Sequence, residues 1–146
     1  MPSSPYTGGC ACGAIRYEIA GEPVFQNDCQ CRDCQHTSGS GHSSYLSFGR
    51  AGATLSGNAT LWDAVADSGN VKTRAFCPTC GSPVYVTFAA MPDHIAVHAA
   101  SLDDPTRYRP QVVTYAMRGH AWDFLDPALP KIERMPQPAR SKQQPA

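Results

Sequence analysis

Neither sign of charge dominates this chain of 146 residues, because 12 lysine and arginine residues balance 12 aspartate and glutamate residues. This balance leaves no electrostatic footprint for nucleic acid or for an anionic membrane surface. Long apolar runs are also missing, since no stretch approaches the roughly 18 residues of a membrane-spanning helix. No apolar leader of the secretory kind precedes the cysteines. We therefore expect neither nucleic acid nor membrane as a partner, and a place in the cytoplasm, where thiols stay reduced.

Sustained helical periodicity is scarce as well. Apolar residues alternate more often than they recur at helical spacing, as the segment 15–19 illustrates. Helix is expected only in short turns near 31–35 and 103–105, and 91–93 has the composition of a turn. The predicted fold class is mainly β, built from antiparallel sheet with little helix. The expected strands are 15–19, 43–48, 61–65, a run that begins at Val71, 83–88 and 94–100.

Length and composition predict one domain. A chain of 146 residues with 42% hydrophobic content can form one compact core and is too short for two ordinary domains. We expect the domain to span 8–134, after a flexible N-terminal arm at 1–7. The last residues contain no large aliphatic side chain, so 135–146 is predicted to be a disordered tail.

The cysteines give the strongest signal in the sequence. They follow the order C-x-C, C-x-C-x-x-C and C-x-x-C, and their number is odd. Spacings of one or two residues suit a metal better than ordinary disulfide loops, and an odd number leaves one thiol over. Disulfides, a single zinc with spare thiols, and a redox thiol in the C-x-x-C of Cys31 and Cys34 are the alternatives. The seven cysteines are Cys10, Cys12, Cys29, Cys31, Cys34, Cys77 and Cys80.

Two of the groups are expected to form one four-thiolate zinc site. Cys77 and Cys80 flank a tight turn, and Gly81 directly after them can take the positive φ that lets backbone amides point at sulfur. This zinc knuckle supplies half a site. Cys10 and Cys12, in a glycine-rich segment, could supply the other half, and four thiolates close a tetrahedral structural zinc.

The remaining three cysteines have no fourth cysteine to complete them. A zinc with three protein ligands, here Cys29, Cys31 and Cys34, keeps an open position and is typical of a reactive site. Water, a histidine or a group from outside would fill that position. His36 and His42 follow closely enough to be ligands or proton carriers, although a solvated loop is the simpler interpretation of both.

Other polar residues have simple structural interpretations. His94 and His98 lie four residues apart in an expected strand, so both should face the same side of it. A surface or partly buried strand position explains them better than a ligand role. The segment 38–41, of sequence SGSG, could offer backbone amides to an anion, but a turn is the simpler interpretation.

The chain resembles the glutathione-dependent formaldehyde-activating enzyme (Gfa) family, which includes a centromere-protein-V-like branch. All seven cysteines, their neighbours and their order match. Two positions depart from the common pattern, because Gln30 and Val113 stand where members often have histidine. The resemblance spans about residues 8–134 and is carried by 8–18, 29–40, 74–85, 101–105, Trp122 and 129–133.

The resemblance implies a fold, two zinc sites and an activity. The fold would be a β-tent related to zinc ribbons. Cys10, Cys12, Cys77 and Cys80 would hold a structural zinc, and Cys29, Cys31 and Cys34 a second, exchangeable zinc with the catalytic role. Characterised members add glutathione to formaldehyde to give S-hydroxymethylglutathione and are classed as carbon-sulfur lyases.

The chemistry of three thiolates agrees with a thiol partner. Three thiolates leave the zinc with a net charge of about minus one, so activation of water is less favoured than in a three-histidine site. A small thiol such as glutathione could be held there as thiolate and attack a small aldehyde, forming a hemithioacetal; the reverse step cleaves a carbon-sulfur bond. The alternatives are a zinc-stabilised binding or scaffold module and a thiol-rich redox or metal-buffering protein. Either a monomer or a homodimer is compatible with the sequence.

Overall fold

The computed structural model describes residues 3–136 and is mainly β, as predicted. One α-helix, α1 (Arg32–Ser38), and four short 3-10 helices accompany the strands of this described part. The 3-10 helices are Arg50–Gly52, Ala99–Ser101, Pro105–Arg107 and Ala116–Arg118. The strands are β1 (Tyr6–Gly9), β2 (Arg16–Ile19), β3 (Phe25–Cys29), β4 (Ser43–Gly49), β5 (Ala53–Ser56), β6 (Thr60–Val65), β7 (Val71–Phe76), β8 (Pro83–Phe88), β9 (Met91–His98) and β10 (Val112–Thr114).

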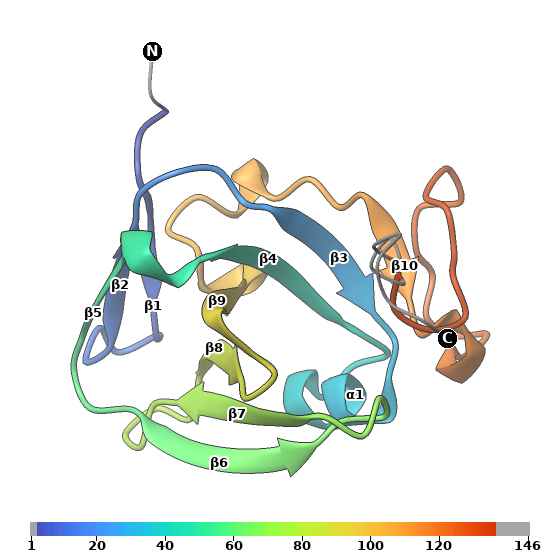
Figure 1. Ribbon diagram of the computed structural model, residues 1–146, viewed down its shortest axis with the longest axis horizontal. Helices are drawn as coiled ribbons and strands as arrows, with labels where there is room; N and C mark the ends of the chain where they lie inside the picture. Colours follow the sequence, from blue (N-terminus) through green and yellow to red (C-terminus); the bar gives the residue numbers. More distant parts are fainter. Residues whose placement is uncertain (1–2, 137–146) are drawn as a thin grey trace, which may run out of the picture.

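The strands form two sheets. The smaller has the order β1-β2-β5, and the larger has the order β10-β3-β4-β9-β8-β7-β6. All pairs are antiparallel except β10 with β3, which run parallel. Figure 1 shows that the larger sheet is strongly curved, with β3 and β4 above, β6 and β7 below and β8 and β9 between them. The smaller sheet stands at one end of this arch and α1 lies towards the other.

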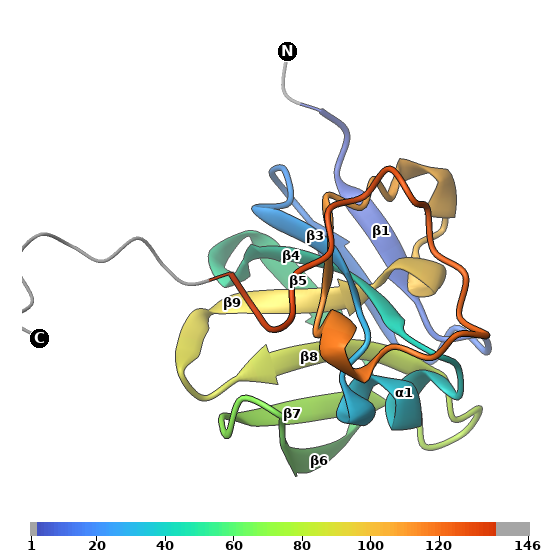
Figure 2. The same ribbon diagram turned by 90° about the vertical axis from the view of Figure 1, so that its right-hand side faces the viewer.

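The chain after β10 covers the end of the molecule where α1 lies. Figure 2 shows this segment, in orange and red, running across that end beside β3 and α1. Backbone hydrogen bonds hold it: Val113 N–H donates to the Pro130 carbonyl at 2.9 Å, and Ile132 N–H donates to the Val113 carbonyl at 2.9 Å. The segment therefore lies along β10, whose outer edge would otherwise be open.

Two clusters of buried side chains form the core. The first fills the space between the sheets, where the Tyr6 and Phe48 rings meet edge-on with centroids 5.1 Å apart. The second lies at the α1 end and contains the three cysteines of the middle group together with Tyr45, Val86, Ala96 and Tyr115. Burial of this apolar surface is the main favourable term in folding. The middle cysteines are thus part of the core rather than of the surface.

Most of the expected strands are confirmed, and the turn at 91–93 is wrong. The β8–β9 hairpin turns at residues 89–90, and β9 begins at Met91. Pro92 is compatible with a strand because it precedes the point where β9 pairs with β4, at His94 opposite Gly49. The strand expected at 94–100 ends at His98 and continues as a 3-10 helix. The short helices expected near 31–35 and 103–105 correspond to α1 and to Pro105–Arg107.

The structure describes most of the predicted N-terminal arm but only the first two residues of the predicted C-terminal tail. β1 begins at Tyr6, so the last two residues of the expected arm pair with β2. The guanidinium of Arg107 lies 3.5 Å from the Tyr6 ring centroid and holds this strand further. The tail predicted at 135–146 lies, beyond Pro136, outside the described residues.

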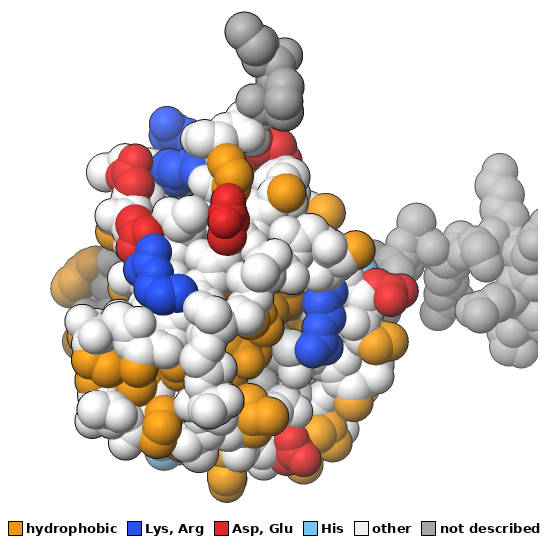
Figure 3. Space-filling model, turned by 90° about the vertical axis from the view of Figure 1, so that its left-hand side faces the viewer, with side chains coloured by type: hydrophobic (Ala, Val, Ile, Leu, Met, Phe, Trp, Pro, Cys, Tyr) orange, Lys and Arg blue, Asp and Glu red, His pale blue; other side chains and the backbone are white. Residues whose placement is uncertain are grey.

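The surface agrees with the balanced composition. On the face shown in Figure 3, acidic and basic side chains are interspersed towards the top, and hydrophobic side chains gather lower down, on the side of β6 and β7. Exposed apolar side chains in that region include Leu61, Trp62 and Val65 of β6. Within residues 3–136, no helix has the length and apolar character needed to cross a membrane.

Candidate metal centres

The first and last cysteine pairs meet at one site, as the sequence predicted. The four sulfurs of Cys10, Cys12, Cys77 and Cys80 all lie within 4.8 Å of one another. The Sγ atoms of Cys12 and Cys77 are 3.6 Å apart although 65 positions separate them in the chain. One pair follows β1 and the other follows β7, so this group joins the smaller sheet to the larger one.

Local turns aim backbone amides at these sulfurs. The amide N–H groups of Thr79 and Cys80 both donate to the Cys77 Sγ at 3.4 Å, and Gly81, with φ of 75°, closes the turn by donating to the Cys77 carbonyl at 2.8 Å. The Ile15 N–H donates to the Cys10 Sγ at 3.2 Å. Such donors stabilise thiolate, which is the form of cysteine that binds metal.

The middle group is assembled by a strand, a turn and a helix. β3 ends at Cys29, Cys31 is the N-cap of α1, and Cys34 lies in the first turn of that helix. The Cys34 N–H donates to the Cys31 Sγ at 3.3 Å, which is the hydrogen bond of a helix N-cap made by a sulfur. All three sulfurs lie within 4.8 Å of one another, and the residues are only 6%, 2% and 1% exposed.

Without a metal, these three thiols hold their protons tightly. The hydrogen bond between the Cys29 and Cys31 sulfurs raises the pKa of Cys29 to about 11. Contact with the Cys29 sulfur, together with burial, raises the pKa of Cys34 to about 12. A divalent cation would replace these protons, because metals bind the thiolate. Three buried, convergent soft sulfurs fit zinc, and so do the four sulfurs of the other group.

A lysine that sequence reasoning missed lies against the middle group. The Lys72 Nζ lies 3.5 Å from the Cys34 Sγ and 2.5 Å from Asp33 Oδ2. Burial alone would lower the pKa of Lys72, but the Cys34 sulfur and the Asp33 carboxylate raise it, so the ammonium stays charged. Nothing in the sequence marks this residue, because its contact joins positions 38 apart across β7 and α1.

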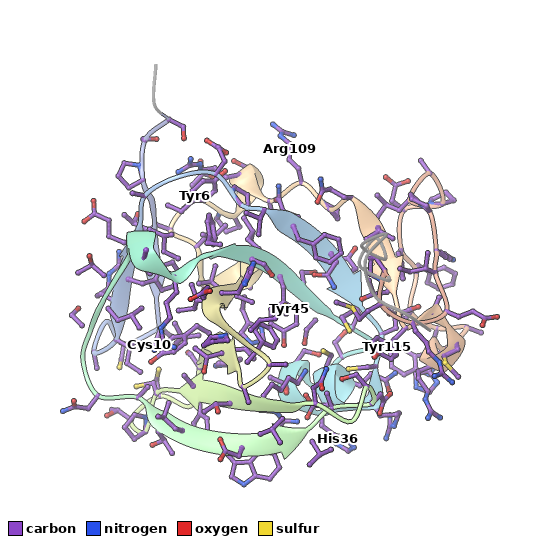
Figure 4. The ribbon with its side chains drawn as sticks, viewed as in Figure 1. Tyr6, Cys10, His36, Tyr45, Arg109 and Tyr115 are labelled. Carbon is purple, nitrogen blue, oxygen red and sulfur yellow. The ribbon has the colours of Figure 1, made fainter. Side chains whose placement is uncertain are left out.

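A tyrosine that contacts the middle group packs against a buried histidine. The Cys34 thiol lies 3.8 Å from the hydroxyl of Tyr45, whose ring packs against the His98 ring with centroids 4.7 Å apart. Figure 4 shows Tyr45 in the interior, between Cys10 at one end of the molecule and Tyr115 at the other. His98 is only 7% exposed, so the expected surface or partly buried position is wrong for it. Burial, together with the charges of Lys72 and Arg74, lowers the pKa of His98 to about 4.

The histidines considered as fourth ligands have other partners. His36 lies in the last turn of α1, exposed and with Nε2 3.4 Å from an Arg32 nitrogen, so it belongs to a helix rather than to a loop. His42 Nδ1 lies 2.9 Å from Asp123 Oδ1. Within residues 3–136, no histidine joins either group of converging sulfurs. The segment 38–41 begins at Ser38, the last residue of α1, and its second residue, Gly39, is the helix C-cap with φ of 67°.

The two positions that depart from the common family pattern have structural roles. Gln30 Nε2 donates to Asp123 Oδ2 at 3.0 Å, which attaches the segment after β10 to the start of α1. Val113 is fully buried in β10. The sequence identified both as departures and gave no indication of these contacts.

Two cavities lie next to the four-cysteine group. The larger, of about 650 Å³, is lined by Arg16, Cys10, His42, several serines and His98. The smaller, of about 290 Å³, is lined by residues that include Trp62 and Arg74. His98 and Pro83 belong to the walls of both. The middle cysteines do not line either of these cavities, but Ser43 in the wall of the larger one donates through Oγ to the Cys34 carbonyl at 2.9 Å.

The fold and site define a mainly β protein with two cysteine centres, one of four thiols and one of three. Residues 5–118 match the model of the glutathione-dependent formaldehyde-activating enzyme family, and the chain belongs to that family. A crystal structure of a Rhodobacter sphaeroides protein is similar in fold, with a TM-score of 0.54 and 21% identity; the match covers 69% of this chain and 93% of that chain. No curated protein matches the chain.

Proposed function

We propose that the protein is a zinc-dependent enzyme of the carbon-sulfur lyase type. It would join a small thiol, glutathione or a similar compound, to formaldehyde or a related aldehyde, and would also catalyse the reverse step. Family membership supports the substrate class. The observation that carries the proposal is the buried convergence of three sulfurs, from Cys29, Cys31 and Cys34, with no fourth protein ligand among residues 3–136. Three ligands leave the open position that a reactive zinc needs.

The two centres would have different roles. The four-cysteine group joins two sheets over a long loop, so a zinc there would contribute its binding energy to folding. The three-cysteine group closes a loop of only a few residues, and its zinc would be the exchangeable one. When bound there, zinc would supply the positive charge that keeps an incoming thiol deprotonated at neutral pH.

The residues of the chain would prepare the site for that chemistry. Cys29, Cys31 and Cys34 would hold the metal, and their burial excludes water that would otherwise compete with the thiol. Lys72 would offset part of the negative charge of the three thiolates. The larger cavity, with its polar lining, has room for a small peptide-like thiol, and its wall includes Ser43, which is hydrogen-bonded to the Cys34 carbonyl.

The proposed step balances without a redox partner. The thiolate sulfur attacks the aldehyde carbon, a C–S bond forms, and the electron pair of the C=O bond moves to oxygen. That oxygen gains a proton equivalent to the one lost by the thiol, which gives a neutral hemithioacetal. The reverse step breaks the C–S bond and regenerates thiol and aldehyde.

The proposal also assigns an organisation and a compartment. The folded unit would be the predicted domain 8–134, extended by the two N-terminal residues that pair in β1. Seven cysteines without a disulfide would suit a reducing compartment such as the cytoplasm.

NMR exchange spectroscopy of a mixture of glutathione and formaldehyde tests the proposed activity. The protein should raise the rate of exchange between free glutathione and S-hydroxymethylglutathione well above the rate in buffer. Cys31→Ser should return the rate to that of buffer, because it removes one of three metal ligands. Chelator-treated wild type should lose the effect and regain it with zinc, which serves as the control. A zinc-loaded wild type that leaves the exchange rate unchanged would contradict the enzyme proposal and favour a scaffold role.

A further inference from the structure

Lys72 is a buried cation at the edge of the three-cysteine centre. It lies in β7, whereas Cys34 lies in α1, and its side chain is 9% exposed. Its ammonium lies 3.5 Å from the Cys34 Sγ. Removing an ammonium group from water is costly unless partners compensate it, so a lysine in this place needs an explanation.

Asp33 alone does not account for the buried ammonium. The Asp33 carboxylate is shared, because Oδ2 faces Lys72 at 2.5 Å and Oδ1 pairs with Arg74. Two cations therefore meet one carboxylate. The Arg74 guanidinium also lies over the Trp62 ring, 4.9 Å from its centroid. Lys72, Arg74 and Asp33 together leave one positive charge directed at the sulfurs.

The net negative charge of a metal-loaded three-cysteine centre would be offset by this one positive charge. Three thiolates and one divalent cation carry a net charge of minus one, and Lys72 with its neighbours brings the total to zero. A neutral fourth ligand would leave the buried group neutral. An anionic thiolate as fourth ligand would bring the net charge to minus one. Without Lys72, the same thiolate-bound centre would have a net charge of minus two.

We propose that Lys72 is a specificity-determining residue that shifts the fourth-ligand preference of the three-cysteine centre away from a neutral ligand and towards an anionic thiolate. This inference rests on the metal centre of the proposed function and deepens it, because it assigns the choice of substrate thiol to a residue outside the ligand set. The competing interpretation is that Lys72 only pins β7 to α1 through Asp33. The two differ in one respect: a pinning residue affects every fourth ligand alike.

Ligand titration of the cobalt-substituted protein separates these interpretations. The visible absorption of cobalt at the three-cysteine centre is followed while 2-mercaptoethanol, an anionic ligand once deprotonated, or imidazole, a neutral ligand, is added at constant pH. The measured quantity is the ratio of the two dissociation constants. Lys72→Met should weaken thiol binding by about tenfold or more and change imidazole binding by less than about threefold. Lys72→Arg, which keeps the charge, should stay close to wild type.

Two further variants make the test specific. Lys131→Met is the matched control, because it makes the same substitution at an exposed lysine, and it should leave the ratio unchanged. Asp33→Asn removes the negative charge that partly offsets Lys72, so it should shift the ratio in the opposite direction, towards the thiol. General structural damage in the two variants would not shift the ratio of dissociation constants in opposite directions. Should Lys72→Met fail to fold by circular dichroism, the Asp33→Asn shift and the Lys72→Arg result decide the question.

The outcomes separate this inference from the proposed function. An unchanged ratio in Lys72→Met, parallel losses for both ligands, or an Asp33→Asn shift away from the thiol would each overturn the role of Lys72. A ratio that shifts as expected in a protein that does not accelerate glutathione–formaldehyde exchange would support Lys72 and contradict the enzyme proposal. Failure of the three-cysteine centre to bind cobalt would overturn both.

Discussion

Single glycines decide whether the four-cysteine group can assemble. Gly9, directly before Cys10, lies so close to β2 that an added Cβ would be 2.0 Å from the Ile15 carbonyl oxygen. The same carbonyl accepts the Cys10 N–H at 3.1 Å, so the approach is part of the hydrogen-bonded turn that positions the first sulfur. The sequence marked this segment as glycine-rich, but the identity of the neighbour depends on the fold of β2.

Gly9→Ala should therefore destabilise the protein by about 2 kcal/mol or more, because backbone on both sides of the contact has to move. Thermal unfolding followed by circular dichroism should show a loss of several degrees. Gly49→Ala is the matched control, since Gly49 has φ of −65° and no atom within 4 Å of an added Cβ. Equal melting temperatures for the two variants would contradict the close approach.

His98 should make stability depend on pH. Its pKa is lowered from 6.5 to about 4 in the folded protein by burial and by the nearby charges of Lys72 and Arg74. The unfolded chain then binds a proton at a pH where the folded protein does not. The stability contributed by neutral His98 is complete above pH 6.5 and is lost as the pH falls towards 4, at about 1.4 kcal/mol per unit of pKa difference.

Urea unfolding of wild type and His98→Phe between pH 7 and pH 4 measures this effect, because phenylalanine can still pack on Tyr45. The free energy of unfolding should fall more steeply with decreasing pH for wild type than for His98→Phe. The difference between the two proteins separates the effect of His98 from the effect of any metal loss in acid, because both proteins would lose metal alike. His36→Phe, at an exposed position, should follow wild type. Parallel profiles for wild type and His98→Phe would show that His98 does not resist protonation.

Among the elements, the sequence predicted those whose signals are local. The knuckle at Cys77, the short helix near 31–35 and strands such as β4 and β8 were expected from turn residues and from alternation. β3 was missed because its buried residues include Asn27 and Asp28, which are polar and are bonded by groups distant in the sequence. β10 was missed because it is three residues long and its partner β3 lies far away in the chain.

The segment after β10 should contribute measurably to stability through one carboxylate. Asp123 accepts from Gln30 Nε2 at 3.0 Å and lies 2.9 Å from His42 Nδ1, and its side chain is 7% exposed. Asp123→Ala leaves both partners partly buried and unbonded, so the free energy of unfolding should fall by about 1–3 kcal/mol. Chemical denaturation measures the change, with Asp93→Ala at an exposed site as the control. A loss no larger than that of the control would show that the segment does not depend on this contact.

At the scale of the whole molecule, one curved sheet connects the two cysteine groups. β7 carries Lys72 to the three-cysteine group and runs directly into Cys77 of the four-cysteine group. Cysteine spacing indicated the division into four and three, since the middle group is close in sequence and the other group consists of two such close pairs. Lys72, the buried His98 and the shared cavity wall could not be predicted, because each depends on how distant strands pair across the sheet.

The zinc-to-protein ratio of purified Cys31→Ser, measured by elemental analysis beside a thermal melt, tests the central claim that a structural centre and a functional centre coexist. If the centres have these separate roles, Cys31→Ser should remain folded with about one zinc per chain and no thiol-aldehyde exchange activity, while Cys77→Ser should unfold or aggregate because a zinc there would join the two sheets. A Cys31→Ser protein that retains two zincs and full activity would contradict the functional role of the three-cysteine centre. So would one that loses both metals and unfolds, since the three-cysteine group would then be structural.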